Sequence, residues 1–255
     1  MLKKLHKKQL LTVKCYLMAE REVFPRISRR HFLAGGVAIT GIMLEKNVHN
    51  LNRLSGILET RNYEELPVHR HIPTTMFYVC EAPSKDNKHI SNVPSAWMTD
   101  WVSAFGGIDD PRHRNERHPY WPASFVPKEN PFYFALPFGD YTTKGPKKHL
   151  DFIPWYRPFK DGKSILKNRW IKITHKDKIA YAQWEDVGPF KEDDRHYVFG
   201  NQRPEFKHAG LDVSPAVNDY LGLDGLANTS WQFVDESQVP HGPWTEIITT
   251  SPPKY

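Results

Sequence analysis

The segment Tyr181–Leu223 decides the fold that the sequence predicts, and it reads YAQWEDVGPFKEDDRHYVFGNQRPEFKHAGLDVSPAVNDYLGL. It begins as an extended run, turns at Gly188-Pro189, and enters a short helix at Ser214-Pro215. Asp186 precedes the turn and Asp212 precedes the helix, so each carboxyl lies where an extended segment ends. A rigid frame holds binding and catalytic groups at such positions. Asp186 and Asp212 are therefore the first candidate site residues.

The regular elements around this segment are short. Ser214-Pro215 combines a capping hydroxyl with Pro at the first helical position, which predicts a helix within Val213–Leu221. Two alternating runs, Arg169–Thr174 and Ile179–Trp184, predict a β-hairpin. Further strands are expected at Thr74–Ala82, Phe132–Phe138 and Trp231–Val234. Short strands, one or two short helices and long loops predict a mainly β protein built as a barrel.

Composition and charge narrow the class of protein. The chain of 255 residues has room for one large or two small domains. Its net charge of +6 comes from the N-terminus, because residues 1–30 hold nine Lys or Arg against two Glu. The remaining residues hold 26 basic and 27 acidic side chains, a net charge of −1. The net charge of residues 31–255 therefore gives no reason to expect binding of nucleic acid.

The N-terminal region carries a targeting pattern. Arg29-Arg30 precedes the 13-residue apolar run Phe32–Leu44, which is shorter than the ~20 residues that span a bilayer. This pattern resembles a twin-arginine export signal. The resemblance implies a signal in residues 1–45, either cleaved or kept as an anchor, and export to the periplasm or beyond. The mixed polar composition of residues 46–72 predicts a linker, which leaves residues 73–255 as the barrel domain. A short buried helix with two surface arginines is the alternative.

Several ordered motifs resemble one barrel family. Asp186-Val187-Gly188-Pro189-Phe190, Leu211–Ala216 and Tyr220–Leu223, with Ala135–Gly139 upstream, are similar to the rare-lipoprotein-A-like double-psi β-barrel. The resemblance covers roughly residues 130–235. It implies a six-stranded barrel of the kind found in expansins, a family of inverting endoglucanases and several lytic transglycosylases. The sequence departs from the pattern at Tyr133, where the family has His, and at Val187, where it has Arg.

The resemblance also implies roles for particular carboxyls. Asp212 takes the position of the general acid or of a residue in the polysaccharide groove, and Asp186 takes a position that lines this groove. Phe105–Asp110 is loosely similar to the first strand of related barrels, where an Asp acts as base, so Asp110 is the third catalytic candidate, with Asp109 and Asp140 as competitors. Structural roles stay open for each: an Asx turn for Asp186, a helix cap for Asp212, and a solvated loop for Asp110.

Glycosidic cleavage explains why carboxyls matter here. A carboxyl with a raised pKa can protonate the leaving oxygen, while an ionised one activates water or stabilises the sugar cation. An inverting hydrolase holds the two roughly 6.5–9.5 Å apart, whereas a lytic transglycosylase needs only one. The expected function is therefore binding and acid-catalysed cleavage of a cell-wall β-linked glycan. A non-catalytic, expansin-like glycan-binding module and an interaction scaffold with its groove filled by residues 141–168 are the alternatives.

Aromatic and polar side chains complete the predicted site. The substrate-binding candidates, for which core packing is the competing role, are Trp121, Tyr133, Asp140, Trp155, Tyr156 and Trp184. The sequence has neither metal-ligand spacing nor a nucleotide fingerprint, so no metal or other cofactor is expected. The expected partners are the polysaccharide and the twin-arginine machinery, and the protein is expected to be a monomer. Of two cysteines, Cys80 lies in an apolar run typical of a buried, unpaired residue.

Overall fold

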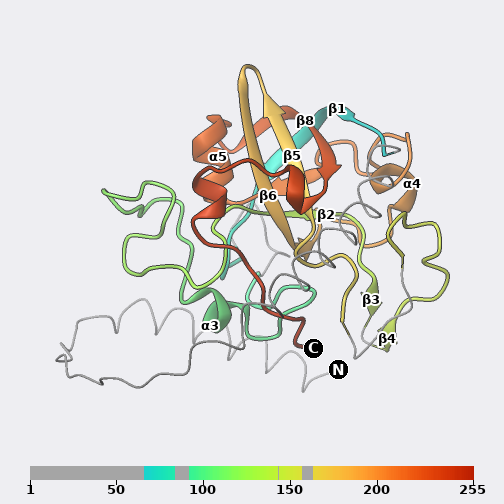
Figure 1. The fold of residues 1–255 in the computed structure, drawn as a ribbon, viewed down its shortest axis with the longest axis horizontal. Coiled ribbons are helices and arrows are strands. Elements are labelled where there is room, and N and C mark those ends of the chain that lie inside the picture. Colours follow the sequence, from blue (N-terminus) through green and yellow to red (C-terminus); the bar gives the residue numbers. More distant parts are fainter. Residues whose placement is uncertain (1–65, 84–91, 143, 157–162) are drawn as a thin grey trace, which may run out of the picture.

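The computed structural model describes residues 66–83, 92–142, 144–156 and 163–255 (Figure 1). The predicted export signal and most of the predicted linker lie outside the described residues. None of the helices in the described part of the chain combines the length and the apolar composition that a bilayer crossing requires.

Six strands close into a barrel in the order β1-β7-β2-β6-β5-β8. They are β1 (His69–Met76), β2 (Tyr133–Leu136), β5 (Trp170–His175), β6 (Lys178–Val187), β7 (Leu211–Val213) and β8 (Leu226–Val234). The pairs β1–β7 and β2–β6 are parallel, and the other four pairs are antiparallel. The short strands β3 (Tyr141–Thr142) and β4 (Gly145–Pro146) form a separate antiparallel pair. The prediction of a mainly β barrel is confirmed, and this mixed topology is compatible with a double-psi barrel.

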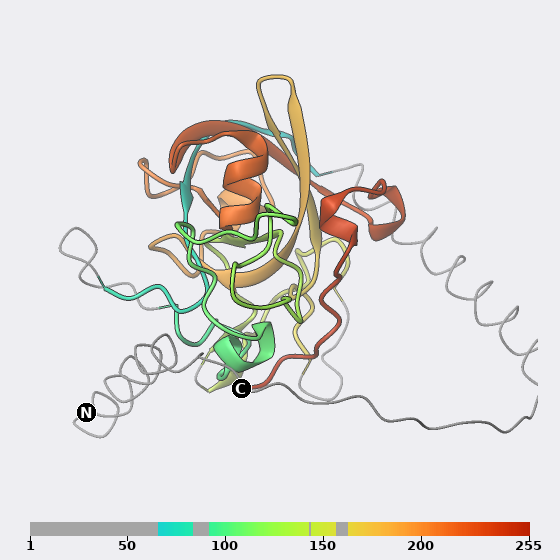
Figure 2. The same cartoon turned by 90° about the vertical axis from the view of Figure 1, so that its left-hand side faces the viewer.

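Three short helices accompany the barrel in the described residues, against the one or two expected: α3 (Trp101–Phe105), α4 (Arg195–Val198) and α5 (Pro215–Leu221). Single 3₁₀ turns occur at Glu236–Gln238 and Pro243–Thr245. The predicted cap of α5 is confirmed, because the Val217 amide donates to Ser214 Oγ at 3.3 Å. Figure 2 shows α5 against the ring of strands.

The predicted hairpin is confirmed as β5–β6, which extends beyond the rest of the barrel (Figures 1 and 2). Its pairing runs from Trp170↔Gln183 to His175↔Lys178. β6 continues to Val187, three residues past the end expected from the alternation. This extension brings Asp186 into the barrel wall instead of leaving it at a strand end. β1 is shifted toward the N-terminus relative to the predicted strand Thr74–Ala82. It begins at His69, inside the predicted linker, and ends at Met76.

The barrel strand β2 separates two apolar cores. Phe134 and Leu136 belong to the larger core, to which all six barrel strands contribute and which therefore fills the barrel. Tyr133 and Ala135 belong to a smaller core with side chains from the segment that follows β1 and from α3. Alternate residues of β2 thus face the inside and the outside of the barrel. The outer face is covered rather than bare.

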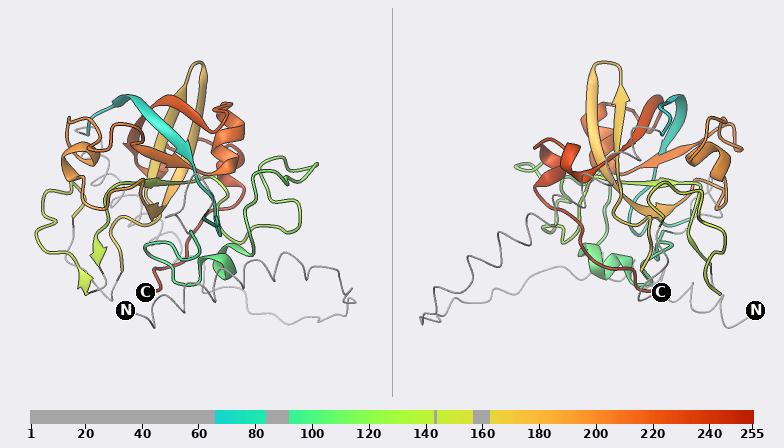
Figure 3. Two further views of the ribbon diagram at one scale, coloured as in Figure 1. Left: turned by 180° about the vertical axis from the view of Figure 1, so that it is seen from behind. Right: turned by 45° about the vertical axis from the view of Figure 1, so that its right-hand side comes forward.

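The C-terminal tail and the continuation of β1 hold the segments that cover this outer face. The C-terminal tail runs back beside α3, where the Lys254 amide donates to the Trp97 carbonyl at 2.7 Å (Figure 1). β1 crosses the barrel wall on the side seen in Figure 3 (left) and leads into the same cover. Within it Cys80 is buried, as its apolar run predicted, and it is disulfide-bonded in the full chain.

Candidate functional site

Strand register gathers four residues into one row across the barrel wall. Thr75 of β1 pairs with Asp212 of β7, Asp212 pairs with Ala135 of β2, and Ala135 pairs with Asp186 of β6. Residues directly opposite each other point to the same face of a sheet. Ala135 identifies this as the outer face, which the smaller core covers. Asp186 and Asp212 therefore flank a small side chain, with about 9–10 Å between their Cα atoms, which is two strand spacings.

A β-bulge makes this row possible. Phe134 pairs with Trp184, but the next residue, Ala135, pairs with Asp186, so Glu185 is the extra residue of β6. Simple alternation would point Trp184 and Asp186 to the same face. The extra residue instead leaves Trp184 in the larger core and turns Asp186 toward Asp212. Glu185 is itself paired in the protein interior, where it accepts from Lys167 Nζ at 2.6 Å.

Asp212 is the central carboxyl of the row, and its residue is 9% exposed. Burial raises the pKa of Asp212 to about 6, and the hydroxyl of Thr75, which donates to Asp212 Oδ1, partly opposes this. The other oxygen, Oδ2, faces Gly188, where a Cβ atom would come within 3.9 Å. A Cβ atom there would make an ordinary contact with Oδ2, so the glycine places no side chain over this oxygen.

Asp186 is held by the backbone on its own side of the row, and it is 7% exposed. The amides of Ala96 and Val187 donate to Asp186 Oδ1 at 2.7 and 2.8 Å. Burial raises the pKa of Asp186 to about 7, against these two hydrogen bonds, and the charge of Asp212 adds to the rise. An ionised Asp212 therefore makes Asp186 harder to ionise.

Glu81 is a third carboxyl that the sequence analysis missed. It lies in the turn after β1, where its Oε2 accepts from Asn92 Nδ2 at 3.0 Å. Burial raises the pKa of Glu81 to about 7, and the charge of Asp212 is the second cause. Its signal was present in the sequence, because Glu81 ends an apolar run just as Asp186 and Asp212 do. We call Glu81, Asp186 and Asp212 the three-carboxyl site.

The three-carboxyl site can hold and release a proton near neutral pH. Each carboxyl has a pKa raised by burial, and Asp212 raises the pKa of both others. Coupled groups of this kind titrate as a set. When one carboxyl loses its proton, the next carboxyl holds its own proton more tightly. An ordinary surface carboxylate, with a pKa near 4, would have no proton to donate at pH 6. The arrangement therefore suits general acid catalysis.

Asp109 and Asp110 lie outside the row and have other partners. Asp110 accepts from the Arg112 side chain and amide and from His113, and these contacts hold the pKa of Asp110 below its ordinary value despite partial burial. Asp109 is fully buried, where Arg114 pairs with it and the Tyr133 hydroxyl donates to it at 2.8 Å. Tyr133 thus anchors the cover of the barrel and has no exposed surface for a substrate.

Asp140 is likewise separate from the row. It is buried and accepts from Trp97 Nε1, Ser164 Oγ and the Ile165 amide at 2.7–3.0 Å, contacts that fix the loop after β2. Burial raises the pKa of Asp140 against these hydrogen bonds. These hydrogen bonds give Asp140 a structural role in holding that loop.

The aromatic candidates divide by exposure. Trp184 is 0% and Trp155 is 3% exposed, and both pack against Phe233 in the larger core. Their proposed contact with a sugar is therefore corrected, because their faces are covered by other rings. Tyr156 is 38% exposed, and Trp121 is partly exposed and stacks on His118 with ring centroids 4.0 Å apart.

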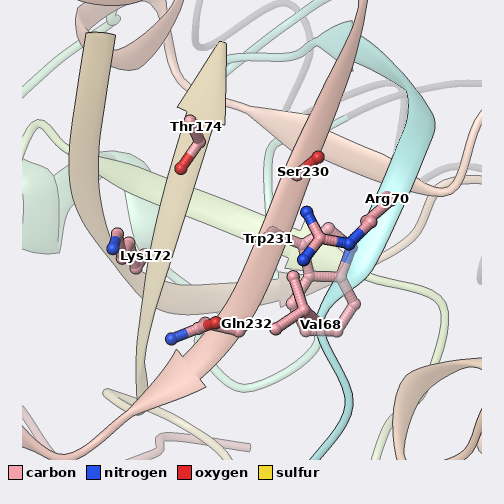
Figure 4. A pocket seen from close by; sticks show the side chains of 7 residues that line it. All are labelled: Val68, Arg70, Lys172, Thr174, Ser230, Trp231 and Gln232. Carbon is pink, nitrogen blue, oxygen red and sulfur yellow. The ribbon is translucent and has the colours of Figure 1, made fainter. Parts of the chain in front are cut away.

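A shallow pocket of about 230 Å³ lies elsewhere, on the outer face of β1, β5 and β8 (Figure 4). Arg70 and Lys172 supply its charge, and Thr174 and Ser230 its hydroxyls. None of its lining residues belongs to the three-carboxyl site. Among the described residues, no group of three or more His, Cys, Asp or Glu side chains is arranged to hold a metal ion.

Comparisons with known proteins do not place the chain in a family: no protein-family model matches it, and neither does any curated protein.

Proposed function

We propose that the protein binds a β-linked polysaccharide of the cell wall and cleaves it by acid catalysis, with Asp212 as the proton donor. One observation carries the proposal. Asp186 and Asp212 flank Ala135 on one face of the barrel, and the pKa of each carboxyl is raised to about 6 or 7. Two carboxyls with a small side chain between them provide the separation and the acidity that glycosidic cleavage requires.

The surroundings of Asp212 assign its two oxygens different tasks. Thr75 donates to Oδ1 and fixes the orientation of the carboxyl. The proton is carried on Oδ2, beside Gly188, and passes to the glycosidic oxygen as the bond to the sugar breaks. Asp212 becomes negatively charged in this step, and that charge stabilises the sugar cation that remains. The raised pKa matters because the donor must hold its proton near neutral pH.

The spacing of the row favours one kind of second step. Side chains on one face of a sheet stand roughly perpendicular to it. Carboxyls on Cα atoms about 9–10 Å apart therefore fit the ~6.5–9.5 Å carboxyl separation of inverting enzymes better than the ~5–5.5 Å of retaining ones. Asp186 or Glu81 would then activate a water molecule in those molecules in which it is ionised while Asp212 keeps its proton, a minority because the pKa of Asp212 is the lowest of the three. In a lytic transglycosylase the sugar's own hydroxyl attacks instead, and Asp212 alone would suffice. The products distinguish these two reactions.

The resemblance of the motifs around Asp186 and Asp212 to the rare-lipoprotein-A-like double-psi barrel supports the same class of substrate. The twin-arginine-like pattern at Arg29-Arg30 supports export. We therefore propose that the protein acts as a monomer in the periplasm or outside the cell, where it would meet this substrate.

A second candidate is a glycan-binding module that does not cleave. The burial of the two aspartates favours it, because Asp212 and Asp186 are only 9% and 7% exposed. A glycan would have to displace part of the cover near Ala96 to reach them. Such a module would bind glycan on the surface beside the row and leave the bonds intact.

Product analysis tests the proposal. The full chain and its Asp212→Asn, Asp186→Asn and Glu81→Gln variants are incubated with purified peptidoglycan and with soluble β-glucan, and products are identified by mass spectrometry. Asp110→Asn is the matched control, since Asp110 lies outside the row. Products from the wild type that vanish in Asp212→Asn and persist in Asp110→Asn support the proposal. Anhydro-sugar ends indicate a transglycosylase, and new reducing ends a hydrolase. An active Asp212→Asn variant excludes Asp212 as donor, and binding without products leaves the second candidate.

A further inference from the structure

An exposed aromatic pair lies in the segment between β6 and β7, the strands that carry Asp186 and Asp212. Phe190 is 62% exposed, an unusual position for a large apolar ring. Its ring centroid lies 4.3 Å from that of Phe206, at an interplanar angle of 39°, and Phe206 is itself partly exposed. The ring centroid of His208 lies 5.6 Å from that of Phe206, in an edge-to-face arrangement. We call the rings of Phe190 and Phe206 the Phe190–Phe206 pair. The ring of His208 extends this surface.

The loops that carry this pair also carry the carboxyls. Phe190 is four residues after Asp186, and Phe206 is six residues before Asp212. Gly188, two residues before Phe190, is the residue that faces Asp212 Oδ2. The backbone of Phe190 is therefore two residues from the glycine that faces the oxygen to which the proposed function assigns the proton.

The two loops are tied together, so the rings are held in place. Lys191 Nζ pairs with Glu205 Oε1. This ion pair joins the loop that carries Phe190 to the loop that carries Phe206. The Glu205 amide donates to Asp194 Oδ2 at 2.7 Å, and Asp194 also caps α4. A binding surface that is fixed before the ligand arrives loses less entropy on binding than a mobile one.

The backbone of Phe190 gives a further reason to look for a role. Its φ angle is +58°, a left-handed conformation that favours glycine and disfavours a residue with a Cβ atom. Stability alone would therefore select glycine here, because the exposed ring adds little to the core. An exposed aromatic side chain in a strained conformation is a feature of functional sites.

We propose that the Phe190–Phe206 pair is a sugar-binding platform on which one ring of the glycan chain stacks next to the bond cleaved at Asp212. This inference rests on the proposed function. The occupant is a β-linked pyranose, whose two faces present axial C–H groups that pack flat on an aromatic ring. The attachment of Phe190 two residues from Gly188, which faces Asp212 Oδ2, favours a glycan over other apolar partners. Phe190 is then a substrate-binding residue, and Phe206 supports it.

The test measures binding of the full chain to insoluble peptidoglycan and to insoluble β-glucan by co-sedimentation. All variants carry Asp212→Asn so that the glycan stays intact. Phe190→Ala and Phe190→Gly should raise the dissociation constant about fivefold, the effect of losing one ring contact. Phe190→Trp should bind within about twofold of the parent, since it restores a flat ring. Tyr255→Ala is the matched control, because Tyr255 is 50% exposed and belongs to a different aromatic stack, with Tyr141.

Thermal unfolding separates binding from folding. Phe190→Gly should keep or raise the melting temperature, because glycine relieves the positive φ. Loss of binding with unchanged or higher stability supports the platform. Unchanged binding of Phe190→Ala, equal loss in Tyr255→Ala, or a fall in melting temperature that parallels the loss of binding overturns it.

The failure of the proposed function gives a different result. If neither the wild type nor the Asp212→Asn parent binds either glycan, the proposed function fails and the platform with it. If the parent binds glycan but the Phe190 variants bind as tightly, only the platform fails. Loss of binding to anionic lipid vesicles in Phe190→Ala, with glycan binding unchanged, would assign the ring to a membrane surface and overturn the inference.

Discussion

Replacing Asp212 by Asn should stabilise the protein, and the gain should depend on pH. Burial raises the pKa of Asp212 from 3.8 to about 6. One pKa unit corresponds to about 1.36 kcal/mol, so ionised Asp212 costs roughly 3 kcal/mol of folding free energy. Asn has nearly the same shape and can still accept the hydrogen bond from Thr75, but it carries no charge. The variant therefore avoids the cost of burying an anion.

The sign follows from which state holds the proton. Below pH 4, Asp212 is protonated whether the protein is folded or unfolded, and the variant and the wild type should be equally stable. Between pH 4 and about 6 the folded state binds the proton more tightly, so the wild type loses stability as the pH rises. Above pH 7 the difference reaches its full value, up to about 3 kcal/mol in favour of Asp212→Asn.

Urea unfolding of the full chain at pH 4 and pH 8 measures this difference. Asp110→Asn is the control of opposite sign, because its contacts with Arg112 and His113 lower the pKa of Asp110, so its ionised form stabilises the fold. That variant should lose a little stability at pH 8, within the small range of surface ion pairs. A gain for Asp212→Asn that is equal at both pH values, or a loss at pH 8, would refute the electrostatic reasoning.

Three further predictions follow from the same structure. Product formation should fall about tenfold or more between pH 6 and pH 8 as the three-carboxyl site loses its protons, and a rate that rises over this range in initial-velocity measurements would contradict acid catalysis. Ala135→Leu should abolish cleavage, because its larger side chain fills the space between Asp186 and Asp212, and should cost about 1–3 kcal/mol in urea unfolding; full activity would show that substrate does not enter there. Lys167→Met should lower the free energy of unfolding by about 3–5 kcal/mol, because it leaves buried Glu185 without its partner. In urea unfolding, the double variant Lys167→Met/Glu185→Gln should recover part of this stability, and no recovery would exclude the uncompensated charge as the cause.

Local sequence signals predicted much of the fold. The alternation in Arg169–Thr174 and Ile179–Trp184 predicted the β5–β6 hairpin, and Ser214-Pro215 predicted the start of α5. Both signals act between residues close in the chain, where side-chain periodicity and capping decide the structure. The order of strands in the closed barrel depends on contacts between distant segments.

The site shows the same limit. Asp186 and Asp212 could be selected because each ends an extended run, but their relation to Thr75 and Ala135 depends on cross-strand register. The bulge at Glu185 reverses the direction that alternation gives to Asp186, and no pattern within β6 announces it. The exposure of aromatic residues was equally hidden. Trp184 resembles a strand-end platform in the sequence but is buried, whereas Phe190 is held outside by a left-handed turn.

The most direct test of the account is a carbon-13 NMR titration of the side-chain carboxyls in the full chain, with Asp and Glu labelled, in the wild type and in Asp212→Asn. The account predicts that Asp212 titrates near pH 6 and Asp186 and Glu81 near pH 7. It also predicts that Asp212→Asn lowers the pKa values of Asp186 and Glu81, because the charge that opposes their ionisation is gone. Values near 4 for all three, or no change at Asp186 and Glu81 in the variant, would contradict the claim that these carboxyls form one coupled site.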